Sequence, residues 1–307
     1  MKTNNALQRG FSLRFRKLLS GAADGVPPWL DVVAAGDDAG LFLPTDAPWI
    51  VHRDFGTLVG GIRALLMQAL HPGALAGVSQ HSRYSSDPLG RLSGTIRWLT
   101  VTTFGSSRAV AGEANRVNRL HTRVSGEFVD GRGQERAYQA SNPDLLLWVH
   151  VAFMESFLVA HERYADAPIP CAHEPSGGDN YVKQWGRSVA PLGLSDVPKT
   201  RAEMDAVLDG FRDRGDLTVT DDTRRVIAFI RKPPLPALAK PIYALLFQAA
   251  VISLRPDFRA MHGIRTAPDW FVRVQTKVLL RALRVAVGPE SPIEEAALNR
   301  LRRLGAI

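Results

Sequence analysis

The sequence predicts an all-α protein that forms a single helical domain, and three observations support this prediction. Apolar residues recur at spacings of three and four along most of the chain, as they do in amphipathic helices. No stretch longer than four residues alternates between apolar and polar side chains as a half-buried strand does. The 307 residues, of which 45% are hydrophobic and 22% charged, are enough to bury a large core without staples.

Capping residues, glycines and prolines place the ends of the expected helices. The residue before a proline avoids the α conformation, so the first of these helices ends before His71. Gly126 is expected to end the fourth, and the loop after it can form a short hairpin through Gly131 and Gly133. The expected helices cover residues 55–70, 73–82, 88–104, 106–126, 142–164, 180–191, 200–213, 220–230, 241–252, 267–286 and 292–304.

The first 25 residues differ in charge from the rest of the chain. Five basic residues precede the first acid, Asp24, and they are interleaved with Phe11, Phe15, Leu18 and Leu19. This pattern fits a basic amphipathic arm that touches a membrane or a partner, and it also fits a partly ordered surface terminus. We therefore divide the chain into a flexible basic arm, 1–25, and a helical domain, 26–307.

The formal net charge of +8 raises the question of a nucleic-acid or membrane surface. From residue 113 onward the basic residues are interleaved with acids, and no zinc-finger, RNP or basic-zipper motif occurs, so we expect no nucleic-acid partner. The single cysteine, Cys171, excludes an internal disulfide. No secretory leader is recognisable, and the longest apolar run, 145–160, is too short to span a bilayer. We expect a cytoplasmic protein, with the arm as its point of peripheral membrane contact.

Several common catalytic motifs are absent from the sequence. It contains no G-x-x-x-x-G-K-[ST] phosphate loop, no dinucleotide-binding G-x-G-x-x-G and no G-x-S-x-G nucleophile elbow. His161 and His173 are each followed by Glu, but the second histidine of H-E-x-x-H is missing. The E-x-x-H pairs of helical di-iron proteins are missing as well. The remaining candidates for chemistry are histidines on apolar helix faces.

His121 shares one helix face with Val110, Ala114 and Val117, because these residues follow the 4-3-4 spacing of an amphipathic helix. The imidazole is therefore expected to point toward the core. One interpretation is a core histidine whose hydrogen bonds are satisfied inside the protein. The other is an axial ligand to a buried metal or haem, because a neutral imidazole in an apolar pocket suits that role.

The long apolar helix repeats this situation with His150, Phe153 and Phe157 on one face. The two phenylalanines either wall a pocket or simply pack in the core. On another helix, Arg91 and Thr95 lie one turn apart, and beside apolar neighbours they need an acceptor such as a propionate, a carboxylate or dioxygen. An Arg in an ordinary surface ion pair is the alternative. Together these faces predict a pocket between helices, where helical proteins place cofactors.

Four segments in this order resemble the MpaB/rubber-oxygenase family, which includes latex clearing protein. They are "LLMQALHPGALAGVSQHSRYSSDPLGRLSGTIRWLTVTTFG" (65–105), "VNRLHTRVSG" (117–126), "YQASNPDLLLWVHVAFMESFLVAHERY" (138–164) and "LAKPIYALLFQAAVISLRPDFRAMHGI" (238–264). The resemblance covers about residues 45–285. It implies a globin-like helical core with a pocket for haem b between its helices, and relatives that use dioxygen to cleave carbon–carbon double bonds in isoprenoid chains.

By motif, the resemblance makes His121 in "HTRVSG" the proximal haem ligand and the residue that binds the metal. It places Arg91 and Thr95 of "RLSGT" near the haem as catalytic and cofactor-binding residues, and His150 matches a further family histidine. The chain departs from latex clearing protein at Gly94, where that protein has a lysine that caps the distal face of the haem. It also departs just after the ligand motif, where Ser125 and Gly126 replace Arg and His.

The resemblance therefore implies a haem b-dependent oxygenase that uses dioxygen on an apolar, lipid- or isoprenoid-like small molecule rather than on a polymer. Phe153 is expected to wall the cofactor pocket beside His150. Two alternatives remain open. One is a haem-binding protein without oxygenase turnover, such as a sensor, a carrier or a peroxidase-like protein. The other is a helical binding protein without haem, whose histidines are merely buried. His71, directly before a proline, is expected to be a structural cap.

Overall fold

The computed structural model describes residues 10, 12–13, 16–17, 22, 24–81, 88–288 and 291–307, with no side-chain description at 78–81 and 88–92. The structure is mostly helical, with 66% helix in fourteen α-helices and one two-stranded hairpin among the described residues. The elements are α2 (Leu30–Ala34), α3 (Ala47–Arg53), α4 (Thr57–Gln68), α5 (Pro72–His81), α6 (Pro88–Phe104), α7 (Ser107–His121), β1 (Ser125–Val129), β2 (Glu135–Gln139), α8 (Pro143–Tyr164), α9 (Gly177–Trp185), the 3₁₀ helix η1 (Gly186–Leu192), α10 (Arg201–Asp213), α11 (Asp221–Arg231), η2 (Ala237–Ala239), α12 (Lys240–Ser253), α13 (Pro256–His262), α14 (Asp269–Val287) and α15 (Pro292–Arg303).

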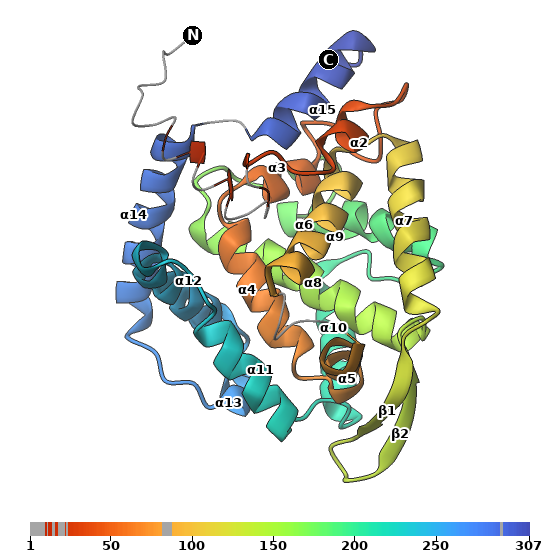
Figure 1. Cartoon of the computed structure of the whole chain (residues 1–307), viewed down its shortest axis with the longest axis vertical. Helices are drawn as coiled ribbons and strands as arrows, with labels where there is room; N and C mark the ends of the chain where they lie inside the picture. Colours follow the sequence, from red (N-terminus) through yellow and green to blue (C-terminus); the bar gives the residue numbers. More distant parts are fainter. Residues whose placement is uncertain are drawn as a thin grey trace.

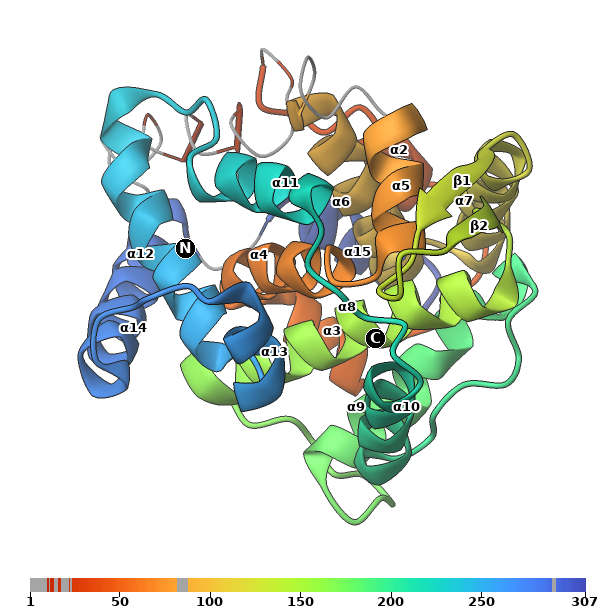
Figure 2. The ribbon, with the colours of Figure 1, turned by 90° about the horizontal axis from the view of Figure 1, so that it is seen from below.

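Helix α8 runs through the middle of the molecule, and the other elements pack around it (Figure 1). Helices α4, α12 and α14 lie toward one side, and α6 and α7 lie toward the other (Figure 1). The view from below shows α8 crossing the centre, with α11 and α5 on one side of it and α9 and α10 on the other (Figure 2). The largest buried apolar cluster joins side chains of α4, α8, α11 and α12. The core therefore lies along α8.

Helices α4 and α8 pack tightly against each other, and Gly60 makes this possible. A Cβ atom at Gly60 would lie 2.6 Å from Cδ1 of Phe157 on α8, which no side chain tolerates. One turn later, Arg63 forms a fully buried ion pair with Glu155 of α8. The guanidinium Nη1 also donates to Oγ of Ser156 at 3.0 Å, and Nη2 donates to the Ser253 carbonyl at 3.1 Å. These bonds compensate the burial of both charges and fix the two helices against each other.

The prediction that Gly126 ends a helix is wrong, whereas the short hairpin expected through Gly131 and Gly133 is confirmed and makes the fold mostly rather than entirely helical. Helix α7 ends at His121, and Gly126 lies in β1, paired with Tyr138 of β2. Phe128 and Tyr138 lie on the same face of this hairpin with ring centroids 6.2 Å apart, and both reach α5. The strands form because alternate residues bury aromatic rings against a helix distant in sequence, which the local pattern does not reveal.

Helices α2, α3 and α13 were not expected from the sequence, because five to seven residues are too few to display a helical period. Tertiary contacts hold the N-terminal ones in place. The buried guanidinium of Arg300 on α15 donates to the Val33 carbonyl of α2 and, at 2.8 Å, to the Phe104 carbonyl at the end of α6. This contact joins residues from both ends of the predicted 26–307 domain.

Among the described residues, α8 is long and apolar enough to cross a membrane by length and composition. Its apolar window is 61% buried within the molecule.

Candidate functional site

Helices α6 and α7 form an antiparallel pair, and the buried Glu113 of α7 fixes their register (Figure 1). Its carboxylate is 2% exposed and accepts hydrogen bonds from Nε of Arg97 on α6 at 2.8 Å and from Nε of Arg116 at 3.0 Å. Burial by itself raises the pKa of this carboxyl, but the hydrogen bonds from Arg116 and Arg97 bring the pKa below its ordinary value of 4.5. Glu113 is therefore an anion that ties the two helices together.

The register set by Glu113 places the predicted site residues of α6 toward the end of α7 that carries His121. Arg91 and Thr95 precede Arg97 on α6, so they lie toward the end of α7 that His121 occupies. The end of α7 lies near the start of α8 (Figure 1), and His150 is the eighth residue of α8. We call Arg91, Thr95, His121, His150 and Phe153 the α6–α8 site.

His121 is the last residue of α7 and is partly buried. The prediction that its face points inward is confirmed for Val110 and Ala114, which are 1% exposed. Val117 and His121, further along the same face, are only partly buried. The Nδ1 atom of His121 is buried and has no hydrogen-bond partner among the described residues. Burial, and then the charge of Arg116, lower the pKa of His121 below its ordinary value of 6.5, so the ring is neutral at physiological pH.

His150 lies deeper in the molecule, at 5% exposure. Its Nε2 atom is buried and has no hydrogen-bond partner among the described residues. Burial lowers the pKa of His150 to about 3, so this ring is neutral as well. One turn further along α8, Phe153 packs on Phe157 with ring centroids 5.7 Å apart. Two histidines on separate helices thus each present an unsatisfied buried nitrogen.

On α6, Arg91 and Thr95 lie one turn apart, and Leu99 continues their face as predicted from the spacing. The side chain of Arg91 is outside the described residues, and Thr95 is half-buried. Leu99 is buried in the cluster that also contains Met154 and Phe157 of α8. This face of α6 is therefore directed toward α8 at least at Leu99.

A histidine that the sequence reading missed holds α6 in place. His52 of α3 is buried, with Nδ1 2.8 Å from Oγ1 of Thr103 on α6 and Nε2 2.9 Å from the hydroxyl of Tyr181 on α9. Burial, and then the neighbouring His161, lower the pKa of His52 to about 3. No local sequence pattern reveals the role of His52, because its hydrogen-bond partners lie 51 and 129 positions away in the chain.

The start of α5 packs against the hairpin that follows α7. The prediction that His71 is a structural cap is confirmed, because its Nδ1 accepts the backbone N–H of Gly73 at 3.1 Å. A Cβ at Gly73 would lie 3.0 Å from the ring of Phe128, so the small residue lets the hairpin approach α5. Val124, one turn after His121, joins Ala76 of α5 in the same small cluster. The side chain of His81, also considered as a ligand from the sequence, lies outside the described residues.

The donor set of the α6–α8 site fits a haem. A haem needs one neutral imidazole on its iron and polar groups for its propionates or its distal ligand. His121 and His150 supply neutral rings, each with a buried nitrogen in need of a partner. The alternative of two ordinary core histidines leaves both nitrogens unsatisfied, which costs about 1–3 kcal/mol for each.

Comparison with known proteins identifies a family over most of the chain. The family model described as "ER-bound oxygenase mpaB/B'/Rubber oxygenase, catalytic domain" matches residues 49–288. This range includes every residue of the α6–α8 site. No curated protein and no solved structure matches the chain.

Proposed function

The chain belongs to the MpaB/rubber-oxygenase family, and from this premise we propose that it is a haem b-dependent oxygenase acting on an apolar, lipid- or isoprenoid-like small molecule. Membership in a family of oxygenase catalytic domains makes an oxidoreductase activity the expected one. The observation that supports haem is the pair of buried, unpartnered ring nitrogens, Nδ1 of His121 and Nε2 of His150. The family resemblance, which does not depend on the positions of the ring nitrogens, also points to His121 as the iron ligand.

His121 is proposed to hold the iron, because a metal ligand must be a neutral imidazole and burial keeps this ring neutral. Its place at the end of α7 is fixed by the Glu113 pairing with α6, so the imidazole is held by the helix pair rather than by a mobile loop. Its second nitrogen requires a hydrogen-bond partner that orients the ring.

Arg91 and Thr95 are proposed to anchor a propionate or the distal ligand from α6, one turn apart. His150 is proposed as a neutral hydrogen-bonding group of the pocket, since a pKa of about 3 keeps it from carrying charge. Haem supplies the activation of dioxygen when it is bound. The protein positions the substrate and excludes water.

An apolar substrate is favoured by the side chains next to the site. Phe153 and Phe157 of α8 and Leu99 of α6 belong to one apolar cluster next to the site, which holds aromatic and aliphatic side chains rather than charge. Such walls favour burial of a hydrocarbon chain, at about 25 cal/mol per Å² of apolar area removed from water. The aromatic pair on α8 therefore supports a lipid- or isoprenoid-like substrate.

Haem reconstitution followed by absorption spectroscopy tests the proposal. We expect a Soret band in the wild-type protein, loss or a large shift of that band in His121→Ala, and an unchanged band in the exposed control His173→Ala. If no Soret band appears after full loading, the protein does not bind haem, and the alternative of a helical binding protein without haem is favoured. Oxygen consumption with squalene, against its saturated counterpart squalane, then tests turnover. Haem binding without squalene-dependent uptake would favour a sensor, carrier or peroxidase-like protein.

We also propose a cytoplasmic location with peripheral membrane contact, and one described surface supports the contact. The arm 1–25 lies mostly outside the described residues, but α14 exposes a row of large apolar side chains: Trp270 (69% exposed), Phe271, Val274, Val278 and Val285. Arg273 and Lys277 flank this row on the same helix. Aromatic residues with flanking cations are typical of helices that lie in the interface of an anionic bilayer.

A further inference from the structure

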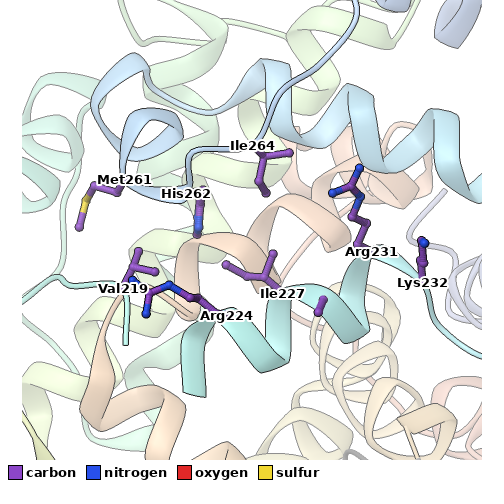
Figure 3. A pocket seen from close by; sticks show the side chains of 9 residues that line it. Val219, Arg224, Ile227, Arg231, Lys232, Met261, His262 and Ile264 are labelled. Carbon is purple, nitrogen blue, oxygen red and sulfur yellow. The ribbon is translucent and has the colours of Figure 1, made fainter. Parts of the chain in front are cut away.

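A cavity opens beside α11, and none of its lining residues belongs to the α6–α8 site. Its volume is 660 Å³, within the range of pockets that bind small molecules. It lies between α11 and the end of α13 with the residues that follow (Figure 3). Nothing in the proposed oxygenase chemistry uses this cavity.

The wall of the cavity is aliphatic. Val219 and Ile227 contribute from the α11 side, and Met261 and Ile264 contribute from the α13 side. No Phe, Tyr or Trp is among the residues that line it. A nucleobase is normally held by stacking on aromatic rings, so these walls favour an alkyl chain over a nucleotide.

The charged residues that line the cavity are all basic. Arg231 and Lys232 lie toward one end, and Arg224 lies toward the other (Figure 3). Within the described part of the chain, neither Arg231 nor Lys232 forms an ion pair with an acid. Arg224 pairs with Asp221 on its own helix, where both side chains are exposed, and a pair of that kind contributes little and is easily exchanged. The rim therefore attracts an anion.

His262 adds an unsatisfied polar group inside the cavity. It is the last residue of α13, and its imidazole points toward α11 (Figure 3). Both ring nitrogens are buried, and neither makes a hydrogen bond of ordinary geometry with a described residue. Burial lowers the pKa of His262 to about 4, although the nearby Leu66 carbonyl opposes the shift. The neutral ring offers one donor and one acceptor to a bound molecule.

We propose that this cavity binds a single-chain lipid whose headgroup is a carboxylate or a phosphate. The cations at the rim bind the headgroup, and Arg231 and Lys232 are the ones without an acid partner. The aliphatic wall around Ile227 covers the chain, and His262 offers a hydrogen bond to the bound molecule inside the cavity. This site is separate from the haem site and does not require haem.

Titration calorimetry on the purified full-length protein tests the proposal with four probes. Laurate and dodecyl phosphate share a chain with dodecanol, which lacks the charge, while acetate has the charge without the chain. We expect laurate or dodecyl phosphate to bind at least ten times more tightly than dodecanol, and acetate to bind too weakly to measure. The tighter of the two anions identifies the headgroup. Equal affinity for dodecanol and laurate, or no binding of any probe, would overturn the proposal.

Variants on α11 locate the binding site. Ala228→Glu places an acid at an exposed position of the cavity wall, and Arg231→Gln combined with Lys232→Gln removes the rim charge. Each is expected to weaken binding of the preferred anion at least tenfold. Arg225→Gln is the matched control, because Arg225 lies on the same helix, does not line the cavity and should leave the affinity unchanged. Wild-type affinity in both cavity variants would contradict the site, and so would a loss of binding in His121→Ala, which alters only the haem site.

Discussion

The Nδ1 atom of His52 on α3 lies 2.8 Å from Oγ1 of Thr103 on α6, and the direction of this hydrogen bond can be assigned. Thr103 donates its own hydroxyl hydrogen to the Leu99 carbonyl at 2.7 Å, so it accepts from Nδ1–H of His52. Nε2 of His52 then accepts from the hydroxyl of Tyr181. A neutral histidine in one tautomer thus joins the three helices α3, α6 and α9.

Protonation of His52 should make the protein less stable in mild acid. Burial, and then His161, lower the pKa from 6.5 to about 3 in the folded state, so between these values only the unfolded chain binds the proton. The stability that His52 contributes is complete above pH 6.5 and falls as the pH drops toward 3. At pH 5 the loss is about 2 kcal/mol for this residue.

Urea unfolding of the wild-type protein and of His52→Gln at pH 7 and pH 5 measures this effect. Glutamine hydrogen-bonds without titrating, so the variant should lose about 2 kcal/mol less than the wild type over this pH interval. The exposed His173→Gln variant should behave as the wild type does. Equal losses in wild type and His52→Gln would show that His52 takes up its proton in the folded state.

Replacing Glu113 by Gln should loosen the α6–α7 pair. The change leaves Arg97 and Arg116 without their shared carboxylate, and we expect the free energy of unfolding to fall by about 2 kcal/mol at pH 7, because both guanidinium groups stay partly exposed. The folded pKa of Glu113 lies below 4.5, so its contribution is present above that pH and is lost as the pH falls further. Urea unfolding at pH 7 and pH 3 should therefore show a smaller difference between wild type and variant at the lower pH. Glu135→Gln on the exposed edge of β2 serves as the control.

Gly94→Lys should change the spectrum of the haem-loaded protein. No described atom lies within 4 Å of a Cβ built at Gly94, so a longer side chain can be accommodated between Arg91 and Thr95 on α6. The resemblance noted in the sequence sets Gly94 against a lysine of latex clearing protein that caps the distal face of the haem in that protein. We expect a shifted Soret band and slower oxygen consumption in Gly94→Lys. Gly94→Ala should keep the wild-type spectrum and unfold with a free energy about 1 kcal/mol higher, because alanine favours a helix over glycine. Identical spectra for Gly94→Lys and wild type would place residue 94 away from the haem.

Removing the apolar row of α14 should weaken binding to anionic vesicles. The substitutions Trp270→Ser, Val274→Ser and Val278→Ser together remove large exposed side chains, each of which contributes about 1.5–3 kcal/mol when fully buried. We expect vesicle cosedimentation to fall at least tenfold in this triple variant. Val129→Ser, at an exposed apolar position of the hairpin, should leave it unchanged. A protein lacking residues 1–25 measures how much of the vesicle binding comes from the arm. Unaltered vesicle binding by the triple variant would show that α14 does not contact the membrane and would assign the contact to the arm.

Most of the helices could be predicted from the sequence because their ends are set by local chemistry. Ser106 accepts the N–H of Ala109, and Asn142 accepts the N–H of Asp144, as the capping rules anticipate. Pro72 and Pro88 begin α5 and α6 at the predicted places. The inward direction of His150 and the shared face of Arg91, Thr95 and Leu99 follow from the helical period, and the family follows from the order of the motifs.

What the tertiary structure decided depends on partners far apart in the chain. The hairpin at 125–139 is stabilised because Phe128 and Tyr138 pack on α5. The sequence of the hairpin itself does not indicate that α5 covers these two rings. The His52 network and the cavity lined by His262 likewise join segments tens of residues apart. A sequence pattern reports which face of an element is apolar, because that depends on spacing alone. Which element covers that face, and which buried nitrogen stays without a partner, is decided only when distant segments compete to fill the same space.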